Sequence, residues 1–182
     1  MRKVFGYLLT TLDGTVEAGD WIGDFFDEDM RDNMVKVISE QDAVLLGRVS
    51  YLEWAAFWPT VTDESPFAPF INTVQKYVVS STLTTNGEWQ PMTLLKGDIP
   101  AEIARMKQQP GNTIGVHASI TLVRTLLEQD LLDELQLVVY PILVGGGRRL
   151  LKEGDSLKHL QLISSRSTRT GGMILTYRPI QR

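Results

Sequence analysis

Short apolar runs that alternate with amphipathic helical patterns limit the possible folds of this chain more than any other feature of its sequence. Runs of strand length lie at residues 4–10, 42–46, 75–80, 89–95, 113–117 and 134–144. Apolar residues recur at helical spacing in segments 28–39, 50–58, 101–108 and 119–129. Strands that alternate with helices need crossover connections, and these favour a largely parallel sheet.

The last part of the chain has a different pattern. Segments 157–166 and 173–178 alternate with period two on either side of Gly171-Gly172, which predicts an antiparallel hairpin. We therefore expect an α/β fold of three layers, with a mostly parallel central sheet, helices on both faces and a C-terminal antiparallel hairpin. A length of 182 residues favours one domain over 1–182.

Composition excludes several classes of protein. The apolar fraction of 43% and the charged fraction of 22% are typical of a soluble globular domain. A net charge of -4 without a basic stripe argues against a nucleic-acid partner. No apolar stretch approaches the ~20 residues needed to span a bilayer, so no membrane partner is expected. Asp13 interrupts the N-terminal apolar run, and the chain has no cysteine. We expect no signal peptide, disulfide or metal site, and a cytoplasmic location.

Three of the predicted strands end on small or polar residues that suit an anion. Ligands of open α/β sheets bind at the carboxyl ends of strands, against helix N-termini. The residues in question are Gly47, Arg48, Val49 and Ser50 after the first such strand, Ser80, Ser81 and Thr82 after the second, and His117, Ala118 and Ser119 after the third. Taken alone, the first stretch is better explained by a glycine turn, a serine cap and a solvated arginine, and an ordinary turn and an N-cap explain the other two. One extended ligand with several phosphates, such as a dinucleotide, would explain all three together.

Five stretches, in this order along the chain, resemble one known family. They are TTLDG (10–14), DAVLLGRVSY (42–51), YVVSSTL (77–83), VHASITLVRTLLEQDLLDEL (116–135) and PILVGGGRRLL (141–151). The chain is similar to the reductase domain of the bifunctional riboflavin-biosynthesis deaminase–reductase, within the dihydrofolate reductase-like superfamily. The zinc-binding deaminase half of those proteins needs cysteines that this chain lacks, so the resemblance is to a stand-alone reductase module.

The resemblance implies NADPH as the cofactor and assigns its binding residues. The Gly-Arg loop would hold cofactor phosphates through Gly47, Arg48, Val49 and Ser50. The next strand end would lie near the adenosine ribose phosphate, through Ser80, Ser81 and Thr82. The pyrophosphate would meet the turn of His117, Ala118, Ser119 and Ile120. Relatives usually carry glycine where this chain has Ala118, and often another where it has Ile120.

The resemblance also suggests residues for the substrate end. Asp13 would lie beside the substrate pocket, although an Asx turn explains it equally well. Asp27 would be the proton-donating acid near the first helix, or else a charge favoured by the helix N-terminus. Tyr51, Trp54 and Tyr140 would line the pocket, or else belong to the core. The loop 145–149 would grip a substrate phosphate or, as we favour, form a flexible turn with a solvated basic pair.

These observations predict an NADPH-dependent reductase that resembles 5-amino-6-(5-phosphoribosylamino)uracil reductase of riboflavin biosynthesis. Two alternatives stay open: a dihydrofolate reductase-like enzyme that acts on a pterin or another small heterocycle, and a non-catalytic nucleotide-binding module. We also expect a homodimer built partly from the C-terminal hairpin, because exposed sheet edges tend to pair. Leu160, Leu162, Ile174 and Leu175 are the apolar residues available for that interface.

Overall fold

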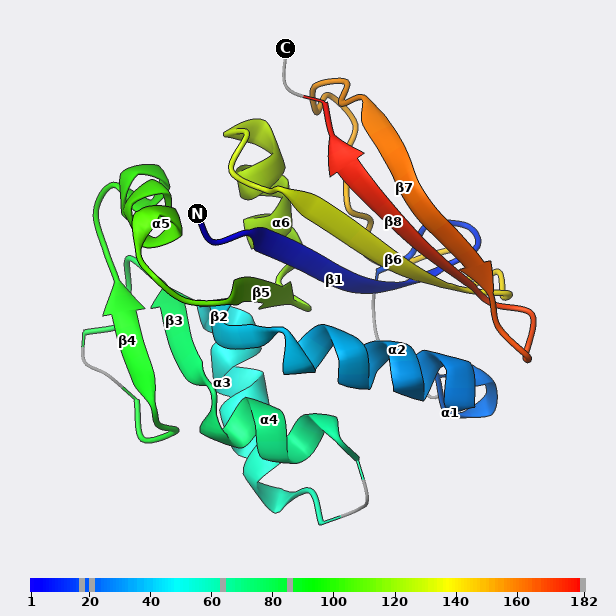
Figure 1. Ribbon diagram of the computed structural model, residues 1–182, viewed down its shortest axis with the longest axis horizontal. Coiled ribbons are helices and arrows are strands. Elements are labelled where there is room, and N and C mark those ends of the chain that lie inside the picture. The colour runs from blue at the N-terminus through cyan, green and yellow to red at the C-terminus, as the bar shows by residue number, and fades with distance from the viewer. Residues whose placement is uncertain (17–18, 20–21, 63–64, 85–86, 181–182) are drawn as a thin grey trace.

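The central feature of the protein is one eight-stranded sheet with the strand order β4-β3-β2-β5-β1-β6-β8-β7 (Figure 1). The computed structural model describes residues 1–16, 19, 22–62, 65–84 and 87–180. Strands β1 to β6 run parallel to one another, whereas β8 is antiparallel to both of its neighbours, β6 and β7. The strands are β1 Val4–Thr11, β2 Gln41–Gly47, β3 Gln75–Val79, β4 Met92–Leu95, β5 Thr113–His117, β6 Glu134–Tyr140, β7 Leu160–Ser167 and β8 Met173–Pro179.

Helices cover both faces of this sheet, so the expected three-layer α/β architecture is confirmed. In Figure 1, α5 and α6 lie above the sheet, and α2, α3 and α4 lie below it. The helical segments are α1 Ile22–Phe25, α2 Glu28–Ser39, α3 Arg48–Phe57, the 3₁₀ turn Trp58–Thr60, α4 Phe67–Thr73, α5 Ile99–Gln108 and α6 Ile120–Glu128. The predicted C-terminal hairpin is confirmed as the pair β7 and β8.

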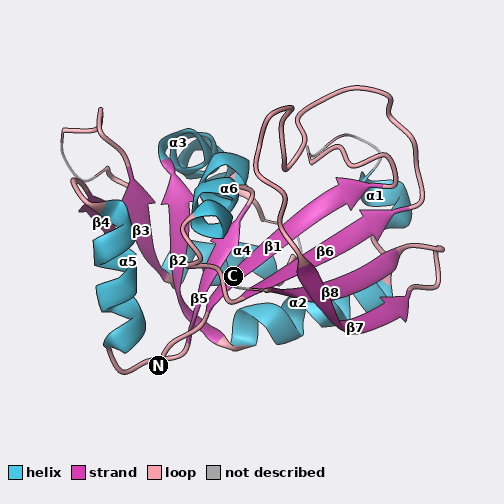
Figure 2. Cartoon of the chain, turned by 90° about the horizontal axis from the view of Figure 1, so that it is seen from above, coloured by secondary structure: helices cyan, strands magenta, loops and turns pink. Residues whose placement is uncertain are grey.

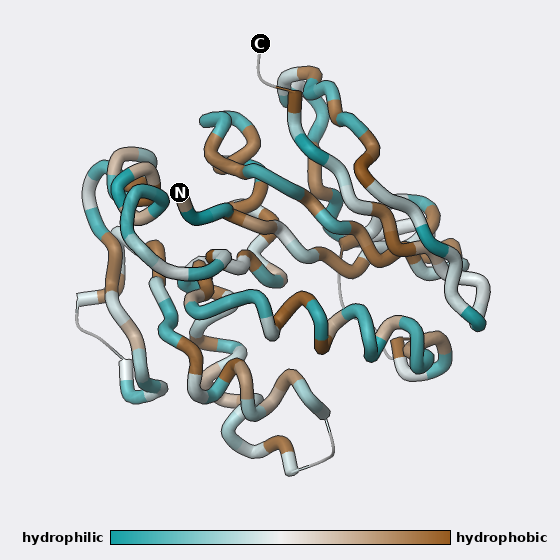
Figure 3. Tube along the Cα trace, viewed as in Figure 1, coloured by the Kyte–Doolittle hydropathy of each residue, from teal (hydrophilic) through white to brown (hydrophobic). Residues whose placement is uncertain are grey.

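The alternation of side chains along each strand divides the core between the two faces. In β2, Leu45 packs with α5 and α6, whereas Val44 and Leu46 pack with α2 and α4. All three are fully buried, which explains why the strand reads as a continuous apolar run rather than as an alternating one. A third cluster joins α2 to β6 and β8 through Met30, Val138 and Ile174. Figure 3 shows hydrophobic stretches, in brown, along the central strands.

Sequence patterns missed two helices and placed the starts of α3 and α5 two residues too late. Helix α4 lies partly inside a segment expected to be a loop because it contains three prolines. Pro69 is tolerated there since it lies in the first turn of α4, where its missing N–H has no intrahelical partner. The four-residue helix α1 is too short for a periodic signal. Helix α3 begins at Arg48 with Gly47 as its N-cap, so Ser50 lies within the first turn and does not open the helix.

The parallel strands bring their carboxyl ends to one edge of the sheet (Figure 2). The turns after β1, β2, β3, β4, β5 and β6 all lie along this edge, which we call the carboxyl edge. Among the described residues, no helix is long and apolar enough to cross a membrane.

Candidate functional site

Two helices meet at the middle of the carboxyl edge with uncapped N-termini. In α2 and α5, an N-terminal N–H group donates a hydrogen bond to a capping side chain, that of Asp27 and Asp98 respectively. Neither α3 nor α6 has a side-chain cap. The first N–H groups of a helix lack intrahelical partners, and the helix dipole adds positive potential there. The ends of α3 and α6 are therefore suited to bind an anion.

The side chain of Ser119 joins these two helix ends. Its Oγ accepts a hydrogen bond from the Gly47 N–H at 3.0 Å and donates to Ser50 Oγ, also at 3.0 Å. Ser119 occupies the N-cap position of α6, but these bonds direct its hydroxyl away from the helix. Residues that were singled out in the sequence at two separate strand ends are thus in direct contact through Ser119.

The turn before α6 has an unusual backbone. Ala118 has a φ of 54°, in the left-handed region that costs any residue with a Cβ about 1–2 kcal/mol. The Ser119 N–H donates to the His117 carbonyl at 2.6 Å, and the Ile120 N–H donates to the Ala118 carbonyl at 3.0 Å. Two such bonds in succession form a tight pair of γ-turns. Glycine at position 118 would relieve the cost, which gives a physical reason for the glycine expected there from the resemblance.

The side chains on either side of this turn face the core. His117 is 3% exposed, its Nε2 donates a hydrogen bond to Gln41 Oε1 at 2.8 Å, and its ring lies 5.3 Å from the Phe67 ring. Burial lowers the pKa of His117 to about 4, so the ring is neutral near pH 7. Ile120 is buried in the cluster beneath α6. Only the backbone of these two residues is available to a ligand at the edge.

A hollow of about 500 Å³ lies beside these helix ends, where β2, β3 and β4 terminate. Two cations, Arg48 and Lys96, contribute to its lining, and no carboxylate does among the described residues. Ser80 shapes the turn, because its Oγ accepts the N–H groups of Thr82 and Leu83 at 3.2 Å and 3.0 Å. The lining residues are Arg48, Val79, Ser80, Ser81, Thr82, Leu95, Lys96, Gly97 and Ile99.

Lys96 is the residue of this hollow that the sequence analysis missed. It directly follows Leu95, the last residue of a strand that was expected at 89–95. The reasoning that selected Arg48 and Ser81, a polar residue just after a buried strand, applies to Lys96 as well. That strand was not considered in the search for anion-binding residues.

Asp13 lies at the opposite part of the edge, after β1, and holds a neighbouring loop. Its carboxylate accepts the Thr11 hydroxyl at 2.5 Å and the Gly145 N–H at 2.7 Å. These hydrogen bonds, that from Thr11 first, lower the pKa of Asp13 to about 2. The Arg149 guanidinium donates to the Asp13 carbonyl at 2.5 Å. The loop 145–149, which we favoured as a flexible turn with a solvated basic pair, is therefore tied to the turn after β1.

Asp27 joins α2 to the tip of the C-terminal hairpin. Its Oδ1 caps α2 by accepting the Met30 N–H at 3.0 Å, and its Oδ2 accepts both the N–H and the hydroxyl of Thr170 at 2.9 Å. Partial burial raises the pKa of Asp27, but the hydrogen bonds from Met30 and Thr170 outweigh it and the net direction is downward. A carboxyl group held as the anion is poorly suited to donate a proton near neutral pH.

Of the three aromatic residues expected near the substrate, Tyr51 and Tyr140 lie in the core and Trp54 is half-buried against it. Tyr140 is fully buried, with the Phe25 ring edge-on at 6.5 Å. Trp54 packs edge-on against Phe67 at 5.6 Å. Tyr51 is buried against Trp89, and its hydroxyl donates to the Trp89 carbonyl at 3.3 Å.

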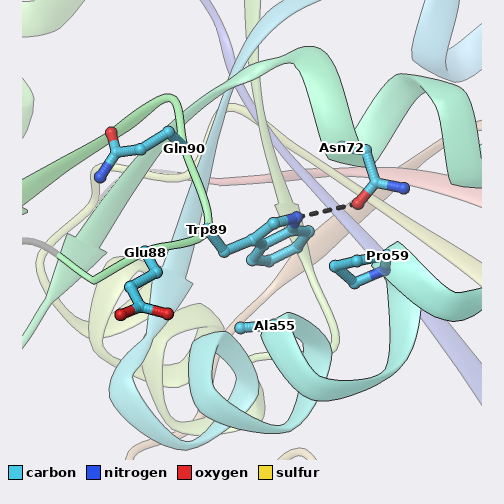
Figure 4. Close-up of a pocket in the computed structure, with 6 residues that line it drawn as sticks. All are labelled: Ala55, Pro59, Asn72, Glu88, Trp89 and Gln90. Carbon is cyan, nitrogen blue, oxygen red and sulfur yellow. Dashed lines mark hydrogen bonds between the residues drawn. The ribbon is translucent and has the colours of Figure 1, made fainter.

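A second hollow, of about 590 Å³, lies at the opposite edge of the sheet, before the amino ends of β3 and β4 (Figure 4). Its wall includes Trp89, whose indole N–H donates to Asn72 Oδ1 at 2.8 Å. None of the residues singled out in the sequence lines it. Among the described residues, no group of three or more His, Asp or Glu side chains could hold a metal ion.

Comparison with known proteins tests the family and the fold. Residues 2–174 match the family model of the RibD C-terminal domain. The uncharacterized protein YyaP of Bacillus subtilis is 26% identical over 97% of this chain and 94% of its own length. A crystal structure from Shewanella sp. PV-4, provisionally named a riboflavin biosynthesis protein, superposes with a TM-score of 0.81 at 21% identity, covering 98% of this chain and 99% of that one. Dihydrofolate reductase from Enterococcus faecalis, complexed with NADP(H), has a TM-score of 0.60 at 9% identity, covering 98% and 97%. The dihydrofolate reductase-like fold expected from the sequence is confirmed.

Proposed function

Because the chain belongs to the RibD C-terminal domain family, we propose that it is an NADPH-dependent reductase of a small nitrogen heterocycle. The observation that carries the proposal is the pair of uncapped helix ends, α3 and α6, joined by Ser119 next to a hollow lined by Arg48 and Lys96. Helix ends and cations along one edge suit a ligand with several phosphates.

The order of the strands gives the direction in which a dinucleotide would lie. The hollow lies at β3 and β4, the joined helix ends follow β2 and β5, and the turns after β1 and β6 come next. Three strand spacings, about 14 Å, separate β3 from β1. The adenosine end would occupy the hollow, the pyrophosphate would lie at the helix ends, and the nicotinamide would lie near the end of β1.

Arg48 and Lys96 would select NADPH over NADH. A guanidinium binds a phosphate through two parallel hydrogen bonds, and an ammonium adds a compact charge. The hydroxyls of Ser81 and Thr82, both exposed at the same hollow, would supply further donors. The 2′-phosphate that distinguishes the two cofactors would therefore be held in this hollow.

When bound, NADPH would supply a hydride, so that the carbon of a substrate C=N bond gains two electrons, its nitrogen takes a proton, and NADP⁺ remains. The residues of the chain would bind and orient the cofactor and the substrate. Because Asp13 and Asp27 are held as anions, we assign the proton to solvent and assign these carboxylates to the border of the substrate site. Tyr140 and Phe25 would form the wall behind them.

Titration with NADPH, followed by cofactor fluorescence, tests the proposal. We expect saturable binding that is tighter than NADH binding. Turnover is then measured as loss of NADPH with the phosphoribosylamino-pyrimidine of riboflavin synthesis and with dihydrofolate. Failure to bind NADPH would exclude the proposed function. Binding without turnover of either compound would leave the cofactor assignment and require a different heterocycle.

We further propose that the chain forms a homodimer through the outer strands. All eight residues of β7 are exposed, and it is the last strand of the sheet. Leu162 pairs with Tyr177 of β8 and is 50% exposed, while Leu160 is 37% exposed. Ile174, which the sequence analysis offered to this interface, is instead buried beneath α2. A row of apolar side chains on an unpaired edge favours association with a second copy.

Sedimentation over a range of concentrations tests the dimer. We expect a species of about twice the 20.4 kDa chain mass, and Leu162→Glu should convert it to the monomer. Thr93→Glu, an exposed position on the opposite edge strand β4, is the matched control. A monomer at every concentration would exclude the interface.

A further inference from the structure

The tip of the C-terminal hairpin lies against the start of α2, although the two are far apart in the sequence. We define the hairpin tip as residues 168–172, which connect β7 to β8. In Figure 1 it lies beside α1, and its Thr170 hydroxyl donates to the Phe25 carbonyl at 2.9 Å. The sequence analysis assigned the hairpin to dimer formation alone. Its relation to the substrate rests on the proposed function, which places Asp27 at the border of the substrate site.

Two glycines let the hairpin tip pack directly on its neighbours. Gly171 has a φ of 85°, in the left-handed region that favours glycine. A Cβ at Gly172 would lie 2.5 Å from Met30 Cε and 3.1 Å from the Val139 carbonyl oxygen, so a larger residue would displace a neighbour. The Gly172 N–H donates to the Thr168 hydroxyl at 3.1 Å. The tip is therefore held in one place against α2 and β6.

Thr170 directs two polar groups at the second oxygen of Asp27. Its N–H and its hydroxyl both donate to Asp27 Oδ2 at 2.9 Å. The hydroxyl has one proton to share between this oxygen and the Phe25 carbonyl, and an ionised carboxylate is the stronger acceptor. Thr168, which is 7% exposed, has its hydroxyl 3.2 Å from Thr170 Oγ1. The Thr170 side chain is thus held between Thr168 and Asp27.

These contacts exceed what a helix cap requires. Asp98 caps α5 through one hydrogen bond, from the Ala101 N–H at 3.1 Å, and its other oxygen has no hydrogen bond among the described residues. Asp27 caps α2 in the same way, by accepting the Met30 N–H on Oδ1 at 3.0 Å. The two bonds from Thr170 take no part in this cap. They fix the plane of the Asp27 carboxylate, because both of its oxygens are then held.

The same hydrogen bonds keep Asp27 ionised. Partial burial raises the pKa of Asp27, but the bonds from Met30 and Thr170 outweigh it, and the net direction is downward. Loss of the Thr170 hydroxyl should therefore let this pKa rise. The other charged and titratable groups around the carboxylate, within the described part of the chain, are Asp24 of α1, Glu28 and Asp29 of α2, Tyr140 of β6, and Arg166 and Arg169 of the hairpin.

We infer that the hairpin tip is part of the substrate site and that Thr170 is a positioning residue for the Asp27 carboxylate within it. Thr170 acts through Asp27 and does not itself touch the substrate. A carboxylate whose direction and charge are already fixed presents the same acceptor to each substrate molecule and needs no reorganisation on binding. The hairpin thus shapes the substrate site in addition to its proposed role in the dimer.

Titration of the Asp27 carboxyl group tests the inference. Its carboxyl carbon NMR signal is identified by its absence in Asp27→Asn and is then followed with pH. Thr170→Val keeps the N–H and the shape of the side chain but loses the hydroxyl, so the pKa of Asp27 should rise by about one unit. Thr170→Ser should restore the wild-type value. Thr73→Val, which removes an exposed hydroxyl at the end of α4, is the control and should leave the pKa unchanged.

Each of these variants can contradict the inference. The same titration of Asp27 in Thr170→Val as in the wild-type protein would overturn it. A rise in Thr170→Ser as large as that in Thr170→Val would also overturn it, because the hydroxyl would then not be responsible. An equal rise in Thr73→Val would show that the change is not specific to the hairpin tip.

Kinetics separate the inference from the proposed function. With the heterocycle that the protein reduces, Thr170→Val should raise KM about fivefold or more, with NADPH affinity at the wild-type value and with recovery in Thr170→Ser. An unchanged KM would overturn the inference. NADPH affinity of the wild-type protein reports on the proposed function alone. Its absence would end that proposal, whereas the titration of Asp27 would still decide whether Thr170 positions the carboxylate.

Discussion

The two ends of the carboxyl edge differ in the charged side chains that they carry. At the hollow formed by β2, β3 and β4, Arg48 and Lys96 contribute to the lining, and no carboxylate does among the described residues. At the turn after β1 and the start of α2, the carboxylates of Asp13 and Asp27 are held as anions, with Arg149 and Arg169 near them. Parallel strands and helix N-termini are common to both ends, so the fold alone does not decide where an anion binds. The side chains placed on it do.

The residue at the N-cap position decides which helix ends remain open to a ligand. Asp27 and Asp98 cap α2 and α5, and thereby occupy helix ends that would otherwise attract an anion. Helices α3 and α6 have Gly47 and Ser119 at the same position, and neither supplies a capping bond. The positive ends of these two helices are therefore left to a ligand. Four predictions test this division.

Removal of both cations from the hollow should have the largest effect. We expect Arg48→Ala combined with Lys96→Ala to weaken NADPH binding by about 100-fold while NADH binding changes little, because two charge-assisted hydrogen bonds are lost. Each single variant should account for part of the loss. Lys36→Ala, an exposed lysine in the last turn of α2, is the control. Equal losses for NADPH and NADH would show that the hollow does not hold the 2′-phosphate.

Acidification should lower the free energy of unfolding of the protein through His117. The pKa of His117 is about 4 in the folded protein, below the ordinary value of 6.5, so the unfolded chain binds the proton more tightly. The stability due to the neutral ring is complete above pH 6.5 and is lost as the pH falls toward 4. We expect a loss of about 2 kcal/mol at pH 5 relative to neutral pH.

Chemical denaturation at a series of pH values measures this effect. His117→Gln should remove the pH-dependent part, whereas His159→Gln, at an exposed position, should leave it in place. An identical pH profile in the wild-type protein and in His117→Gln would show that another group is responsible.

Loss of the hydrogen bonds that Ser119 makes with Gly47 and Ser50 should have a smaller effect on stability and on cofactor binding. Ser119→Ala removes the acceptor of the Gly47 N–H and the donor to Ser50, so we expect a loss of about 1–2 kcal/mol in the free energy of unfolding. NADPH binding should weaken together with NADH binding, because both cofactors carry the pyrophosphate. Calorimetry with each cofactor checks this, with Ser39→Ala as the control at an exposed hydroxyl. An effect on NADPH alone would contradict the placement.

Relief of the left-handed turn should have the smallest effect and the opposite sign. Because Ala118 has a φ of 54°, we expect Ala118→Gly to stabilise the protein by about 0.5–1 kcal/mol and to preserve or improve NADPH affinity. Asp130→Gly, at a φ of 53° after α6, should add stability without a change in affinity. A fall in NADPH affinity with Ala118→Gly, in a protein of unchanged stability, would show that the phosphates do not approach this turn.

The periodic elements could be read from the sequence because they depend on neighbours along the chain. Helix α2 at Glu28–Ser39 and strand β5 at Thr113–His117 have the predicted bounds. The position of Arg48 directly after a buried strand could also be read from the sequence, because the end of a strand is a local feature. The family resemblance depended on such stretches, and their order along the chain was enough to predict the fold.

Tertiary structure decided which of these residues act together and which way their side chains point. The contact of Ser119 with Gly47 and Ser50 depends on β5 lying beside β2, a pairing between segments about 70 residues apart. Local spacing does not reveal it. The same applies to Asp27, whose second oxygen is bound by Thr170 at the hairpin tip. The sequence by itself determined the elements and the polar residues at their ends. The order of the strands then determined whether each of those residues became a cap, a bridge, a core group or a binding group, because that order decides which partners come within hydrogen-bond reach.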